Sequence, residues 1–222
     1  MSNLRLNKVR SQTPITILVN GGNRLSYLIA KALIDQGSYV VIIDKFNNET
    51  KKYISELKKS ELVDFFDFKG FESLFKNIKR FDYMFYFLNE KLQKSEFDSK
   101  EFLLETNYLE QSLINTKKNN AKFSLITSLA LNRELANRVN GEDVSKPSPY
   151  SNIELQKYCE NMVAEFGDRN DVNLRIIRLA TLIGKGIDTI AVPSIDTMFR
   201  DSTAKGGYAS RAAYRRYAFG RL

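Results

Sequence analysis

The residues near the start of the chain follow the order that a dinucleotide-binding site requires. The segment LVNGGNRLSYLIAKALIDQGSYVVIID reads as an apolar strand, a turn at Gly21 and Gly22, an amphipathic helix, a second strand and an acid at Asp44. In such sites the glycine turn lets the backbone approach a pyrophosphate, and the acid hydrogen-bonds a ribose hydroxyl. The Asp44 carboxylate would repel a 2′-phosphate, so the pattern favours NAD over NADP.

The composition narrows the chemistry further. The chain contains no histidine, which excludes Ser-His-Asp catalysis, Cys-His catalysis and histidine-ligated zinc. Acid–base groups must then be carboxylates, tyrosines, lysines or the one cysteine, Cys159. We expect no metal site. A single cysteine forms no intrachain disulfide, which suits a reducing compartment, either the cytoplasm or an organelle interior.

Six short apolar runs alternate with segments of helical period, a pattern typical of a doubly wound α/β protein with a parallel sheet. We expect a Rossmann arrangement. The expected strands cover residues 15–20, 40–44, 62–66, 83–88, 123–127 and 173–179, and the expected helices cover 24–36, 48–60, 71–77, 97–116 and 150–166. The apolar stripe expected on the first helix is Leu25, Leu28, Ile29, Ala32 and Leu33.

Charge divides the chain into three parts. The net charge is +8, of which residues 1–12 carry +3 and residues 200–222 carry +5. We therefore predict a basic arm at 1–13, a Rossmann-like domain at 14–187 and a basic tail at 188–222, with the ends meeting an acidic partner. No apolar run is long enough for a membrane span or a secretory signal. The tail interleaves rings and guanidinium groups that can stack and pair with anions, chiefly Arg211, Tyr214, Arg215, Arg216, Tyr217 and Arg221.

Several segments in register resemble the extended short-chain dehydrogenase/reductase family, the NAD-dependent nucleotide-sugar epimerases and dehydratases. The resemblance covers residues 14–190 and includes FFDFKG, ETNYLEQSLIN, SPYSNIELQKY and RLATLIGKG. It implies Tyr150 as the acid–base group and Thr127 or Ser128 near the substrate. It also implies an NAD site formed by Gly21, Gly22, Asn23, Arg24, Asp44, Asp67 and Asn107.

The departures from that family concern its chemistry. The glycine turn TGGxGFIG falls on NGGNRLSY, so Arg24 replaces the glycine that approaches the pyrophosphate. Tyr27, or Ser26 if the turn is one residue shorter, replaces the glycine that allows close contact between helix and sheet. The family's lysine, four residues after its tyrosine, is here Glu154. A carboxylate there disfavours a tyrosinate and leaves the nicotinamide ribose without its cation.

The leading hypothesis is a catalytically impaired protein with this fold, an accessory subunit docked through its basic tail to protein partners, nucleic acid or anionic lipid. One alternative is a working NAD-dependent epimerase or dehydratase that uses Tyr150. Another is a sensor that binds NAD(H) without turnover and needs Asp44 and Asp67. Simpler interpretations also stay open: Gly21 and Gly22 as a tight turn only, the two aspartates as ordinary caps, and the tail as a disordered basic segment or a leftover of lost coding sequence.

Overall fold

The computed structural model describes residues 12–46, 54–88, 99–128 and 152–179. The chain divides into a unit of Met1–Ala180 and a unit of Thr181–Leu222, and every described residue belongs to the first. Within the described ranges, no helix is long and apolar enough to cross a membrane.

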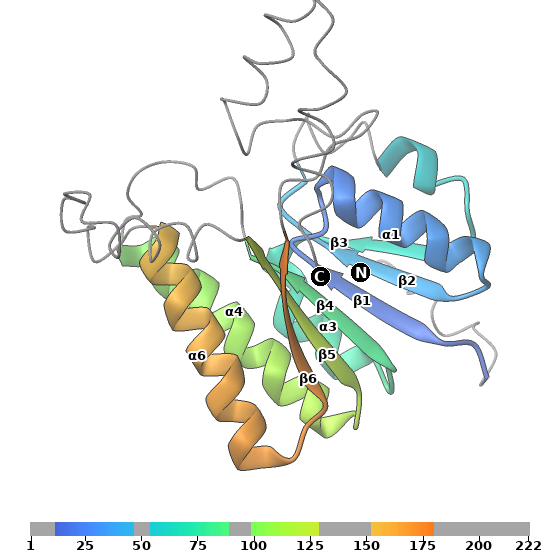
Figure 1. Cartoon of the computed structure of the whole chain (residues 1–222). Helices are drawn as coiled ribbons and strands as arrows, with labels where there is room; N and C mark the ends of the chain where they lie inside the picture. Colours follow the sequence, from blue (N-terminus) through green and yellow to red (C-terminus); the bar gives the residue numbers. More distant parts are fainter. Residues whose placement is uncertain (1–11, 47–53, 89–98, 129–151, 180–222) are drawn as a thin grey trace, which may run out of the picture. The chain divides into compact units, whose positions relative to one another are not determined.

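Six parallel strands form a single sheet in the order β3-β2-β1-β4-β5-β6 (Figure 1). This is the strand order of the Rossmann fold, and it confirms the predicted fold class. The central strands are continuous apolar runs because helices cover both faces of a parallel sheet. The strands are β1 (Ile15–Val19), β2 (Tyr39–Ile43), β3 (Val63–Phe66), β4 (Tyr83–Phe87), β5 (Lys122–Ser128) and β6 (Leu174–Leu179).

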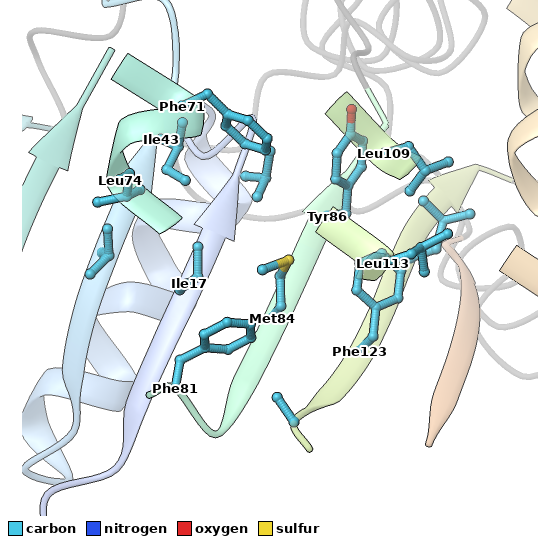
Figure 2. Close-up of a cluster of buried hydrophobic side chains, with 14 of the residues drawn as sticks. Ile17, Ile43, Phe71, Leu74, Phe81, Met84, Tyr86, Leu109, Leu113 and Phe123 are labelled. Atoms are coloured by element: carbon cyan, nitrogen blue, oxygen red, sulfur yellow. The ribbon is translucent and has the colours of Figure 1, made fainter. Parts of the chain in front are cut away.

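The helices lie on the two faces of the sheet. One face is covered by α3 (Phe71–Asn77), α4 (Ser99–Lys118) and α6 (Asn152–Asn170), with α4 and α6 side by side (Figure 1). The other is covered by α1 (Arg24–Asp35). A short 3₁₀ turn, η2 (Phe68–Gly70), precedes α3. Figure 2 shows the larger core, in which side chains of α3 and α4 pack on those of β1, β2, β4 and β5.

The orientation of α1 corrects one expectation. Leu28 is 38% exposed and Ala32 is exposed, although both were expected on the buried stripe. The helix instead presents Ser26, Tyr27 and Ala30 to the sheet. Two of these three residues are small, and the close approach of the helix to the sheet near Gly21 requires small side chains. Of the expected stripe, Leu25, Ile29 and Leu33 are partly buried and pack against the core, so the expectation is wrong only for Leu28 and Ala32.

Candidate functional site

Gly21 follows β1 in a turn that leaves no room for a side chain. A Cβ atom there would lie 2.7 Å from Ile42 Cγ2, 2.9 Å from Ser26 Oγ and 3.0 Å from the Leu18 carbonyl oxygen. Ser26 is fully buried against this turn. Ser26 thus occupies the small-residue position between helix and sheet, which agrees with the turn that is one residue shorter than the family's.

Asn20, the last residue before the glycine pair, adopts the left-handed backbone conformation with φ 55°. Asparagine tolerates this region better than most residues. Its side-chain amide donates to the Phe87 carbonyl oxygen at 2.8 Å and to Glu105 Oε1 at 2.8 Å. Side-chain hydrogen bonds to neighbouring elements therefore hold the residue that starts the turn.

The helix after the turn is capped by its own sequence. Asn23 is the N-cap of α1, and its Oδ1 accepts from the Ser26 amide at 2.8 Å. Its Nδ2 donates to the Asn20 carbonyl oxygen at 3.0 Å. Arg24, the first residue of the helix, places its guanidinium 5.0 Å from the centre of the Tyr27 ring. Tyr27 donates to Glu56, so Arg24 packs along an anchored side chain of its own helix.

Asp44 stands directly after β2 and lies beside the turn, as predicted. Its Oδ2 accepts from the Gly22 amide at 2.5 Å, and the residue is half-buried. Asp67 stands directly after β3, is exposed, and accepts from the Lys69 amide at 2.9 Å as the cap of η2. The structure thus brings Asp44 together with Gly22. Asp67 acts as a local cap, which was one of its two sequence interpretations.

The polar residue of α4 that reaches the turn is Glu105, which sequence analysis missed. Glu105 is 6% exposed and accepts from the Tyr86 hydroxyl at 2.9 Å as well as from Asn20. The predicted residue Asn107 lies two positions later, on the exposed side of the helix. A signal was present: Glu105 precedes Leu109 and Leu113 at intervals of four, along the buried stripe.

A second buried carboxylate, Glu160 on α6, accepts hydrogen bonds from three residues. Its oxygens accept from Thr127 Oγ1 and Gln156 Nε2, both at 2.9 Å, and from the Arg178 guanidinium at distances of 2.6 to 3.1 Å. Burial opposes ionisation of Glu160, but hydrogen bonds from Arg178, Gln156 and Thr127 hold its pKa below the ordinary value. The hydroxyl of Thr127, a predicted substrate contact, donates into this cluster.

The remaining predicted site residues are only partly placed. Glu154 lies in the first turn of α6 and forms an ion pair with Lys157 at 2.8 Å. Ser128 ends β5, whereas Tyr150 lies outside the described residues, as does the predicted tail site at Arg211, Tyr214, Arg215, Arg216, Tyr217 and Arg221. In the part of the chain that the structure describes, no cluster of His, Cys, Asp and Glu could hold a metal ion.

The site therefore has two halves of different character. At the turn, backbone amides and Asp44 lie together at the carboxyl ends of β1 and β2, where Rossmann proteins bind nucleotides. At the ends of β5 and β6, Thr127 and Arg178 are engaged with Glu160.

Comparison with known proteins identifies the type of fold. No family model matches the sequence, and no curated protein matches it. Among solved structures, a short-chain type dehydrogenase/reductase from Mycobacterium ulcerans is similar at TM-score 0.57 and 11% identity, over 85% of this chain and 75% of that one. An alcohol dehydrogenase from the archaeon Thermococcus sibiricus, complexed with 5-hydroxy-NADP, is similar at TM-score 0.53 and 15% identity, over 77% of each chain.

A UDP-galactose 4-epimerase is also similar, at TM-score 0.55 and 13% identity. The match covers 74% of this chain and 55% of the epimerase, so the chain spans about half the length of that protein. Identities this low establish the fold alone. The protein has the Rossmann fold of short-chain dehydrogenases and epimerases, as the sequence predicted.

Proposed function

We propose that this chain is a catalytically impaired protein with the short-chain dehydrogenase fold, retaining a dinucleotide-type turn and serving as an accessory subunit of a larger assembly. The observation that carries the proposal is Glu154. It takes the position of the family's lysine and is ion-paired with Lys157 at 2.8 Å. A carboxylate at this position would disfavour a tyrosinate, whereas the family's lysine lowers the tyrosine pKa.

The turn suits the adenosine half of an NAD molecule. Gly21 admits no Cβ, and the Gly22 amide orients Asp44 at the end of β2. Asp44 would hold a ribose hydroxyl, and the first turn of α1 would face the pyrophosphate. Bound NAD supplies hydride transfer in enzymes of this fold.

The half of the site where chemistry would occur fits less well. Thr127 is 4% exposed, and its hydroxyl donates to the Glu160 carboxylate, which also pairs with Arg178. Orienting a substrate would require Thr127 to leave a buried, charge-assisted hydrogen bond. The hypothesis that catalysis is impaired is therefore supported by two positions, Glu154 and Thr127, in addition to the sequence of the turn.

The first experiment is calorimetric titration of the whole protein with NADH. Asp44→Ala is the test variant, and Asp35→Ala, which removes an exposed carboxylate at the end of α1, is the charge-matched control. Binding at micromolar concentration that is lost only in Asp44→Ala supports the dinucleotide site. No binding at millimolar NADH would remove that part of the proposal and leave a scaffold role alone.

The second experiment asks whether chemistry persists. The protein is incubated with NAD and a panel of nucleotide sugars, and epimerised or dehydrated products are measured. We expect no turnover by the wild-type chain. Turnover that Tyr150→Phe abolishes would overturn the proposal and establish the enzyme.

A dinucleotide sensor is the second candidate, because the hydrogen bond from the Gly22 amide to Asp44 joins the turn to the residue that would hold the ribose. Binding of NADH would then compete with or reinforce that contact. Assembly with the partner would depend on NADH and on Asp44, while Tyr150 would be dispensable.

The accessory role itself predicts that deletion of residues 200–222 abolishes co-purification with the partner, and unchanged association would contradict it.

A further inference from the structure

The glycine turn begins at a residue in a conformation that its own backbone does not favour. Asn20 has φ 55° and is 9% exposed. A non-glycine residue stays in this region only when surrounding contacts hold it there. The question is therefore which contacts hold Asn20.

Those contacts come from two other elements. The Asn20 amide donates to the Phe87 carbonyl oxygen at the end of β4 and to Glu105 Oε1 on α4, each at 2.8 Å. Glu105 is itself fixed by the Tyr86 hydroxyl, which donates to Oε1 at 2.9 Å and is fully buried. Figure 2 shows the Tyr86 hydroxyl at the tip of a ring packed within the core.

Asn20 is also hydrogen-bonded to the residue that caps α1. The Asn20 carbonyl oxygen accepts from Asn23 Nδ2 at 3.0 Å, and Asn23 Oδ1 accepts from the Ser26 amide at 2.8 Å. A continuous series of hydrogen bonds thus runs from Glu105 on α4, through Asn20, to the first turn of α1. Gly21 and Gly22 lie in the chain between Asn20 and Asn23, which this series links. The Gly21 amide donates to the Ile43 carbonyl oxygen, and the Gly22 amide donates to Asp44.

From this geometry we propose that Glu105 is a positioning residue for the glycine turn, acting through Asn20. The inference deepens the proposed dinucleotide site and rests on it for its functional meaning. Glu105 sets the backbone of the turn that would receive the pyrophosphate, and it does so from the far helix without touching the ligand. In the family, glycines allow the backbone conformation of this turn. Here the buried Glu105 carboxylate, through Asn20, helps to impose it.

The decisive test measures amide hydrogen exchange of the full chain without any ligand. In Glu105→Ala, and separately in Asn20→Gly, we expect the Gly21 and Gly22 amides to exchange about tenfold faster, the equivalent of one lost hydrogen bond. The Val41 amide, in the middle of β2, should exchange at its wild-type rate. Asn20→Gly keeps the left-handed conformation accessible, so it isolates the side-chain contact and serves if Glu105→Ala fails to fold.

Two further variants separate positioning from general loss of stability. Glu105→Gln retains an acceptor oxygen for both donors and should keep the wild-type protection of Gly22. Gln156→Ala removes a buried polar side chain from the Glu160 cluster on α6, so it should lower Tm while leaving Gly22 protected. Unchanged exchange of Gly22 in both Glu105→Ala and Asn20→Gly, or equal acceleration of Val41, would overturn the proposal.

NADH titration then links the turn to function. If the wild-type chain binds NADH, Glu105→Ala should raise Kd by about tenfold, and Gln156→Ala should leave it unchanged. An unchanged Kd in Glu105→Ala would refute positioning of the binding site. If the wild-type chain does not bind NADH, the dinucleotide proposal fails on that result, and the exchange rates still decide whether Glu105 positions the turn.

Discussion

Cys159 is fully buried where α6 packs on the sheet. Burial, reinforced by the nearby Glu105 and Glu160 carboxylates, raises the pKa of its thiol. A neutral, enclosed thiol is a poor nucleophile. We expect native protein at pH 8 to resist iodoacetamide and to be alkylated once unfolded in urea, as measured by intact-protein mass spectrometry. Equal labelling rates before and after unfolding would show that the thiol is accessible.

Glu160 makes the stability of the protein depend on pH. Its pKa lies below the ordinary value of 4.5, since the hydrogen bonds from Arg178, Gln156 and Thr127 outweigh the effect of burial. A carboxyl that is more acidic in the folded state stabilises the protein above its unfolded pKa, and this stabilisation is lost as the pH falls through the folded pKa. The stability difference between wild type and Glu160→Gln should therefore shrink as the pH falls below about 4.5 and through the lower folded pKa.

Chemical denaturation across that pH range measures the effect. At pH 7 we expect Glu160→Gln to lower the free energy of unfolding by about 2 kcal/mol, because it weakens charge-assisted bonds while Arg178, 40% exposed, stays partly hydrated. Glu165→Gln breaks an exposed pair with Arg169, with side chains 65% and 75% exposed, and should change stability by less than about 0.5 kcal/mol. A constant difference between wild type and Glu160→Gln down to pH 3 would contradict the role assigned to the carboxylate.

At the scale of helices and strands, the sequence predicted most of this fold. All six strands were expected within one or two residues of their observed bounds, because buried parallel strands are short runs of β-branched and aromatic residues. α1 ends at Asp35 just before Gly37, which has φ 81° and provides a stop signal that sequence can supply. Asp44 was placed correctly for the same reason, since it directly follows a strand that is plainly visible in the sequence.

The interior of the site could not be predicted in the same way. Glu105 and Glu160 are charged, and charged residues on a helix are usually exposed. Their burial depends on partners that come from distant parts of the chain, namely Asn20 and Tyr86 for one, and Thr127 and Arg178 for the other. The burial of Ser26 likewise reflects the close packing at Gly21, which hydrophobic periodicity does not report.

The turn between β1 and α1 gives a test at this scale. Gly21→Ala would place a Cβ atom 2.7 Å from Ile42 Cγ2 and 3.0 Å from the backbone oxygen of Leu18. Since backbone cannot yield as a flexible side chain can, we expect a loss of about 2–3 kcal/mol in the free energy of unfolding. The matched control is Gly70→Ala, where the nearest atom is Ser73 Oγ at 3.7 Å. Urea denaturation of both variants should separate them clearly, and equal losses would argue against tight packing at the turn.

At the scale of the whole molecule, the net charge is concentrated near the two ends of the sequence. The net charge of +8 comes entirely from residues 1–12 and 200–222. Within the body, acids and bases balance, and its buried carboxylates are paired inside the fold. An acidic partner would therefore be attracted to the ends of the chain rather than to the body.

This distribution makes a prediction that net charge alone does not. Replacing Arg211, Arg215, Arg216 and Arg221 with Gln removes four charges from the tail. Replacing Lys58, Lys59, Lys79 and Lys118, which are exposed on the body, with Gln removes four charges from elsewhere and leaves the same net charge. On a heparin column, used as a polyanion, the tail variant should elute on the order of 0.1 M NaCl earlier than wild type, because clustered charges bind a polyanion together.

The body variant should elute close to wild type. If the two variants elute together, net charge governs the interaction and the tail has no special part in it. If the tail variant elutes early and also fails to join its partner, the same arginines serve both contacts. An accessory subunit would then consist of a body with the Rossmann fold and a basic tail that provides the attachment.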